Sequence, residues 1–80
     1  MTLNEFMNVL RSDTNEIWLT TGDSYIRIAE YNYKLVQDES MFGNISIDDI
    51  LVENDGEITI TLDISEKLFN DIGYKIDEMV

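Results

Sequence analysis

Residues 16–28 of the chain, EIWLTTGDSYIRI, contain two β-prone runs on either side of the dipeptide Gly22-Asp23. A pair of this kind is typical of the tight turns that join two antiparallel strands, and the turn fixes which residues face each other. We therefore expect a β-hairpin with an aliphatic face and an aromatic, polar face. The expected cross-strand pairs are Trp18 with Arg27, Leu19 with Ile26, Thr20 with Tyr25, and Thr21 with Ser24.

A second hairpin is expected around Asn54-Asp55-Gly56, with Gly56 in the left-handed conformation. Its aliphatic side chains should gather on one face, opposite a strongly acidic face. Since Ile45 and Ile47 differ in parity from Ile50, we expect a bulge or a bend at residues 48–49 and a strand that starts near residue 49. The expected pairs are Glu53 with Glu57, Val52 with Ile58, and Ile50 with Ile60.

Helices are expected at both ends of the chain. Thr2 and Glu5 form a capping-box pattern, and apolar residues follow at helical spacing over residues 3–11. Ser65 is a candidate cap for a carboxy-terminal helix, which either ends before Gly73 or continues through it. The polar residues 12–15 predict a loop, and residues 31–44 fit a strand or a short helix. The sequence thus predicts one α+β domain over residues 1–80, with a four-stranded, mainly antiparallel sheet from two hairpins and a helix at each end.

The composition excludes several kinds of function. With no Cys and no His, the chain lacks thiol nucleophiles, zinc-finger ligands and the commonest general base. A chain of 80 residues buries only about 60% of its unfolded surface, which leaves little room for a walled active-site cleft. We therefore expect neither an enzyme nor a cofactor. No apolar run approaches the roughly 18 residues of a membrane span, so we expect a soluble cytoplasmic protein.

The charge favours a basic protein partner. Asp and Glu number 17 against 5 Lys and Arg, for a formal charge of −12, and this field repels nucleic acids and anionic membranes. The densest acidic stretch lies in the second hairpin, where carboxylates on a rigid sheet can imitate the spaced charges of a phosphate backbone. The residues concerned are Asp48, Asp49, Glu53, Asp55 and Glu57.

The same acidic stretch could instead be an ordinary solvated turn or a metal site. The calcium-loop pattern fails, because placing Gly56 at its obligatory sixth position puts Leu62 where a bidentate glutamate is needed. Paired carboxylates could also serve a glycosidase, but they would need the cleft that a chain of this size lacks.

The aromatic residues Trp18 and Tyr25 are further candidates for partner contacts. Together with Arg27 they should be neighbours on the non-core side of the first hairpin, and these residue types are enriched at interaction hot spots. Two structural roles compete with binding: Trp18 could be covered by the carboxy-terminal helix, or it could stack under Arg27.

The whole layout resembles very small, acidic α+β proteins of bacteriophages and mobile elements, anti-CRISPR proteins among them. The resemblance lies in the short helix at residues 2–11, the hairpins at residues 16–26 and 52–60, the size and the charge. Several such proteins act as nucleic-acid mimics. The resemblance implies a non-catalytic inhibitor of a CRISPR effector or another bacterial defence nuclease, acting in the host cytoplasm. The alternative is a homodimeric structural or adaptor module that pairs through Trp18, Tyr25 and Leu51.

Overall fold

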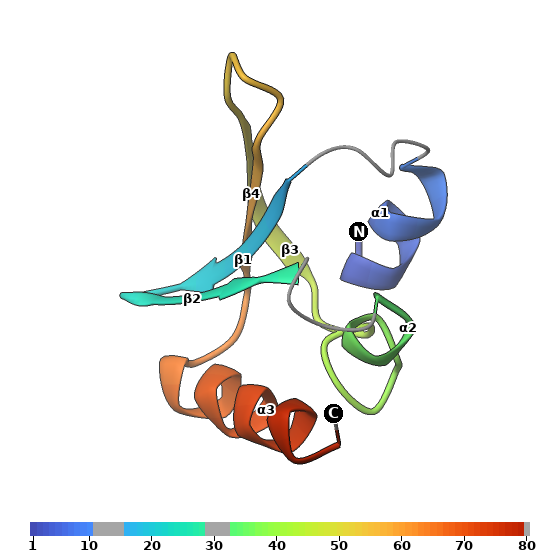
Figure 1. Ribbon diagram of the computed structural model, residues 1–80, viewed down its shortest axis with the longest axis vertical. Coiled ribbons are helices and arrows are strands. Elements are labelled where there is room, and N and C mark those ends of the chain that lie inside the picture. The colour runs from blue at the N-terminus through green and yellow to red at the C-terminus, as the bar shows by residue number, and fades with distance from the viewer. Residues whose placement is uncertain (11–15, 29–32, 80) are drawn as a thin grey trace.

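The computed structural model describes residues 1–10, 16–28 and 33–79, which form three helices and one four-stranded sheet (Figure 1). The expected α+β class is confirmed, with a helix before the sheet and a helix after it. The elements are α1 (Leu3–Val9), β1 (Ile17–Thr21), β2 (Ser24–Arg27), α2 (Tyr33–Val36), β3 (Ile47–Val52), β4 (Ile58–Leu62) and α3 (Glu66–Glu78).

The two hairpins join side by side in the order β2-β1-β4-β3. Both expected strand registers are confirmed, and each hairpin is antiparallel. The hairpins meet through a parallel pairing of β1 with β4, in which Ile17 lies opposite Ile58 and Leu19 opposite Ile60. The sheet is therefore mixed, with its only parallel pairing among the described strands at the centre.

The turn of the first hairpin is fastened to helix α3. Gly22 has a φ of 57° and Asp23 a negative one, the pattern of a type II′ turn. The Asp23 N–H donates to Glu66 Oε2 at 2.6 Å, and the Ser24 hydroxyl donates to the same oxygen at 3.2 Å. Glu66 thus links the first turn of α3 to the tip of the hairpin.

The irregularity expected in the second hairpin, a bulge or a bend, is a bulge, and the first strand starts earlier than expected. Gly56 has a φ of 88°, as its turn requires. The register shifts between Ile47 and Asp49, which leaves Asp48 as the extra residue. The expected start near residue 49 is wrong: β3 begins at Ile47, because this residue pairs with Leu62 across the bulge and its N–H donates to the Met1 carbonyl at 2.8 Å.

Each of the two terminal helices begins directly after the cap residue that the sequence predicts. Thr2 and Glu5 form the expected capping box, but α1 ends at Val9 rather than at residue 11, because Leu10 is extended, with a ψ of 116°. The predicted loop at 12–15 lies outside the described residues. Ser65 caps α3 as expected, and this helix continues through Gly73 to Glu78. A Cβ at position 73 would lie 3.2 Å from Ile26 Cδ1, so the glycine lets α3 pack closely on β2.

The sequence of residues 31–44 fits a strand or a short helix, and the described part of this segment begins with a short helix. Tyr33–Val36 form the single-turn helix α2, and a tight turn follows over residues 37–44. Gly43 is buried in this turn, where its N–H donates to the Asp38 carbonyl and its carbonyl accepts from Asn4 N, both at 2.9 Å. The turn is thus held against the start of α1.

A single core cluster lies between the helices and one face of the sheet. The rings of Phe42 and Phe69 meet in it, with centroids 5.2 Å apart. The buried apolar residues are Leu3, Ile17, Leu19, Ile28, Val36, Met41, Phe42, Ile58, Ile60, Leu62, Phe69 and Ile76. The aliphatic face of the second hairpin is only partly covered, since Val52 is 65% exposed. The reason is that the β3–β4 tip projects beyond the helices (Figure 1).

Candidate protein-binding face

The sheet has one face that the helices leave uncovered, which we call the open face. Its side chains alternate along each strand with those of the core, and the helices pack on the core side through residues such as Leu3, Val36 and Phe69. Across the four strands, one row of the open face consists of Arg27, Trp18, Thr59 and Leu51, and the next row consists of Tyr25, Thr20, Thr61 and Asp49.

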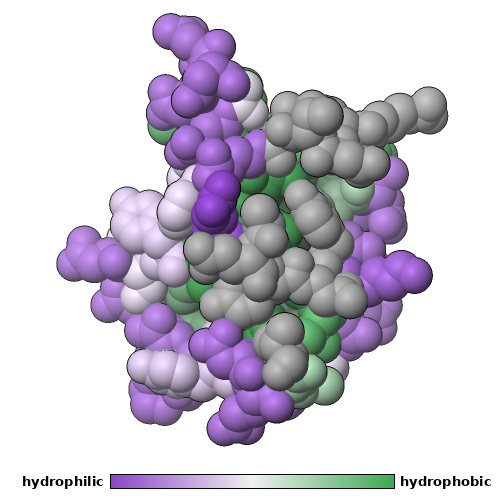
Figure 2. Space-filling model, viewed as in Figure 1, coloured by the Kyte–Doolittle hydropathy of each residue, from purple (hydrophilic) through white to green (hydrophobic). Residues whose placement is uncertain are grey.

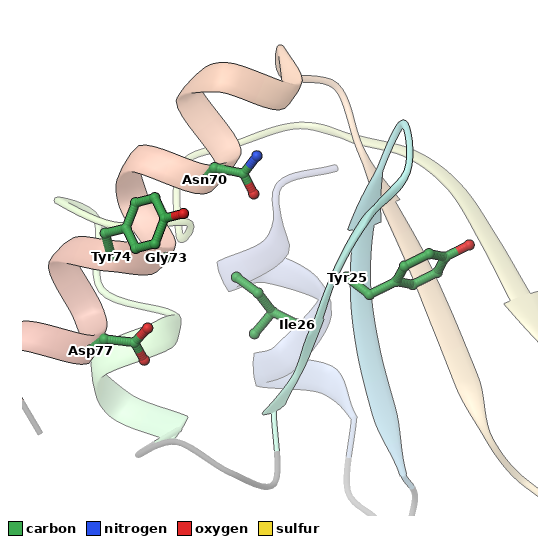
Figure 3. A pocket seen from close by; sticks show the side chains of 6 residues that line it. All are labelled: Tyr25, Ile26, Asn70, Gly73, Tyr74 and Asp77. Atoms are coloured by element: carbon green, nitrogen blue, oxygen red, sulfur yellow. The ribbon is translucent and has the colours of Figure 1, made fainter.

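Two neighbouring residues of β2, Tyr25 and Ile26, point to opposite faces of the sheet. In Figure 3, Ile26 points toward α3 and the ring of Tyr25 points away from it. Both residues line a small groove together with Asn70, Gly73, Tyr74 and Asp77. Tyr25 is 61% exposed and meets Trp18 in an edge-to-face contact, with ring centroids 6.5 Å apart and an interplanar angle of 81°. This geometry is a favoured one for aromatic pairs.

A hollow of about 240 Å³ lies on the open face, lined by Trp18, Tyr25, Glu57 and Thr59. Each hairpin contributes two of these residues, so the hollow straddles the parallel junction of β1 and β4. The alternative in which α3 covers Trp18 is wrong, because α3 packs on the other face. The volume of the hollow suits a single side chain rather than a drug-sized ligand, whose pockets begin at about 300 Å³.

Trp18 carries a polar atom without a partner. Its Nε1 is buried, and no described residue accepts a hydrogen bond from it. Buried indole N–H groups normally find an acceptor, since an unsatisfied donor costs free energy. The indole N–H is therefore a donor that the described part of the fold buries at a cost in free energy.

The carboxylates of the second hairpin gather near this hollow. Glu57 is half-buried at the end of the loop, where its N–H donates to Asp55 Oδ1 at 3.0 Å, and the Glu53 N–H donates to the Glu57 carbonyl at 2.8 Å. Burial, followed by the charges of Asp55, Glu16 and Glu53, raises the pKa of Glu57 above its ordinary value. Hydrophilic side chains cover the projecting hairpin in Figure 2. This end of the sheet concentrates negative charge.

One cation of the chain already lies among these acids. Arg27 Nε is 2.6 Å from Glu16 Oε1, and both side chains are about 40% exposed, which makes the pair worth at most about 1 kcal/mol. This contact holds the guanidinium of Arg27 at Glu16. Neither Arg27 nor Glu16 lines the hollow.

The pKa of Glu57 predicts how stability responds to pH. A carboxyl group whose pKa is raised on folding contributes stability that is complete below its unfolded pKa, here near 4.5, and is lost as the pH rises through the folded value. We expect Glu57→Gln to raise the melting temperature at about pH 7 and to leave it unchanged at about pH 3, where Glu57 is already neutral. Thermal unfolding followed by circular dichroism measures the melting temperature at both pH values.

A matched control for this prediction is Glu39→Gln, an exposed carboxyl in the turn after α2. It removes the same charge from a turn that lies outside both hairpins, so the change in melting temperature should be smaller. A lower melting temperature for Glu57→Gln at neutral pH would show that the Glu57 carboxylate stabilises the fold.

The structure brings together only some of the partner-contact residues that the sequence predicts. Trp18, Tyr25 and Glu57 line the hollow, and Glu53 and Asp55 belong to the adjoining loop. Asp49 lies on the same face but further along the sheet, opposite Thr61, and Asp48 is the extra residue of the bulge.

Sequence reasoning missed Glu16 and Thr59. The β1–β4 register, continued by one residue, sets Glu16 beside Glu57, and the Ile58 N–H donates to the Glu16 carbonyl at 2.8 Å. Thr59 lies opposite Trp18. Only the strand order could have revealed these neighbours, and no local pattern carries it.

Other properties of the chain bear on the kind of site. Among residues 1–10, 16–28 and 33–79, no group of three or more acidic side chains is placed to hold a metal ion. None of the helices in the described part of the chain is both long and apolar enough to cross a membrane. Comparison with protein-family models, with curated proteins and with solved structures finds no match for this chain.

Proposed function

We propose that this protein is a non-catalytic inhibitor that lays its open face on a basic, nucleic-acid-binding channel of a bacterial defence nuclease, such as a CRISPR effector. The observation that carries the proposal is the hollow beside the hairpin carboxylates, on a sheet face that the helices leave uncovered. It combines a Trp–Tyr pair with concentrated negative charge in a chain of formal charge −12. Inhibition would follow from occupying the channel in the host cytoplasm.

Charge complementarity explains why the partner should be basic. Carboxylates on a rigid sheet present charges at fixed spacing, and a channel lined by Lys and Arg is built to receive such charges. A homodimer through the same face would bring together two surfaces that both carry negative charge, and like charges repel. The charge therefore favours a basic partner over a second copy of the chain.

The proposal is tested by capturing guide-loaded CRISPR effectors from bacterial lysates with the tagged protein, across a salt series and with double-stranded DNA as competitor. We expect both salt and DNA to displace the captured effector, because the contacts are electrostatic and the site is shared. Capture that neither displaces would contradict mimicry. A protein that captures no effector, and whose mass by light scattering doubles with concentration, would instead support the homodimer.

Charge reversal locates the contact surface. We expect the double variant Glu53→Lys/Glu57→Lys to bind the effector at least about 100-fold more weakly, because it turns two attractive contacts into repulsive ones. The matched control is Glu39→Lys/Glu78→Lys, which changes the net charge equally but alters exposed residues outside the second hairpin. Binding is measured by titration at fixed salt, after circular dichroism shows that both variants are folded. Equal losses in the two variants would mean that net charge alone, and not the open face, drives binding.

A further inference from the structure

We infer that the hollow between Trp18, Tyr25 and Glu57 seats the guanidinium group of one arginine side chain of the partner. This inference rests on the proposed function and deepens it, because it names the chemical group that the centre of the open face recognises. Two features of the hollow support it: an aromatic pair, and a carboxylate that accepts no hydrogen bond from the described residues.

The aromatic pair offers a site for a cation. Because Trp18 and Tyr25 meet edge to face, at 81°, and are not stacked, their contact covers only part of one ring face. A cation over the face of a tryptophan or tyrosine is attracted by the negative charge of the π system, and arginine is the most frequent such cation in proteins. The exposed position of Tyr25 leaves the approach open.

The carboxylate of Glu57 supplies the opposite charge. Within the described residues no hydrogen bond or ion pair engages its oxygens, whereas Glu16 is paired with Arg27. Burial and the neighbouring acids raise the pKa of Glu57 although the charge of Arg27 acts to lower it, so a further cation would relieve an unfavourable charge. A planar guanidinium can also donate two parallel hydrogen bonds to one carboxylate, which an ammonium cannot.

The single tryptophan of the chain gives a direct test, because an ¹⁵N-labelled sample has one indole Nε1–H resonance. We expect N-acetyl-arginine N-methylamide to shift this resonance saturably, at concentrations up to about 100 mM, which saturate a site of millimolar affinity. The citrulline analogue has nearly the same shape and the same backbone carbonyls, but a neutral ureido group replaces the guanidinium. It should shift this resonance little when sodium chloride matches the ionic strength. Glu57→Gln should weaken arginine binding at least about tenfold, whereas Asp63→Asn, an exposed acid with the same change of charge, should leave it unchanged.

Several results would overturn the inference: no saturable shift with the arginine compound, an equal shift with the citrulline analogue, an equal shift with N-acetyl-lysine N-methylamide, or equal losses of arginine binding in the two variants. The experiment uses no partner protein, so it separates the two proposals. Saturable arginine binding in a protein that captures no nuclease would overturn the proposed function alone. Salt-sensitive capture of a nuclease by a protein that ignores arginine would overturn only the assignment of the hollow.

Discussion

Phe69→Ala is expected to lower the free energy of unfolding by about 3–5 kcal/mol, the usual cost of removing a buried phenyl ring. Phe69 is fully buried, and its ring packs on that of Phe42 at a centroid distance of 5.2 Å. The pair joins α3 to the turn after α2, two segments far apart in the chain. A domain of this size has a total stability of about 4–12 kcal/mol, so the variant should be largely unfolded at the lower end of this range.

Urea denaturation followed by circular dichroism at 25 °C measures this loss. The neighbouring residue provides the control, because Leu68 lies on the same helix but is 48% exposed. Leu68→Ala should cost less than about 1 kcal/mol. If the two variants lost similar stability, α3 would not pack on the core through the face that Phe69 marks.

Gly43→Ala is expected to be destabilising by about 3 kcal/mol or more, at the upper end of what overpacking costs. A Cβ at this position would overlap the carbonyl oxygen of Gln37 and lie 2.8 Å from that of Asp38. Both obstacles are backbone atoms of the same tight turn, so they cannot move aside as a flexible side chain would. The displaced turn would also loosen the hydrogen bond between the Gly43 carbonyl and Asn4 at the start of α1.

The adjacent Asn44→Ala is the matched control, because Asn44 is exposed and directly follows the glycine. It should change the unfolding free energy by no more than about 0.5 kcal/mol. Chemical denaturation measures the unfolding free energy of both variants. A Gly43→Ala variant as stable as the parent would show that the turn accommodates a side chain despite the crowding of its backbone atoms.

The two hairpins could be predicted from the sequence because their determinants are local. Gly22 and Gly56 mark the turns, and alternation along each strand then fixes the register, including the bulge at Asp48. The parallel pairing of β1 with β4 was not predicted, since it joins residues far apart in the chain. The exposure of Val52 was missed for the same reason: a pattern shows which side a residue faces, but not whether a helix covers that side.

Only part of the candidate site could be predicted from the sequence. Trp18 and Tyr25 were expected to be neighbours because one hairpin holds them both, and Glu53, Asp55 and Glu57 because one loop does. The hollow itself could not be foreseen, because it forms only where the two hairpins meet. Asp48 and Asp49 were grouped with the loop carboxylates by closeness in sequence, but the strand separates them along the sheet.

The parallel junction at the centre of the sheet also bears on the order of folding. Each hairpin closes a short loop and can form within microseconds, whereas β1 and β4 must meet across about 40 intervening residues. We therefore expect the docking of the two hairpins to limit the folding rate. The hollow is completed in that same late step, so neither hairpin alone would carry it, and a partner that recognises it selects only chains that have finished folding.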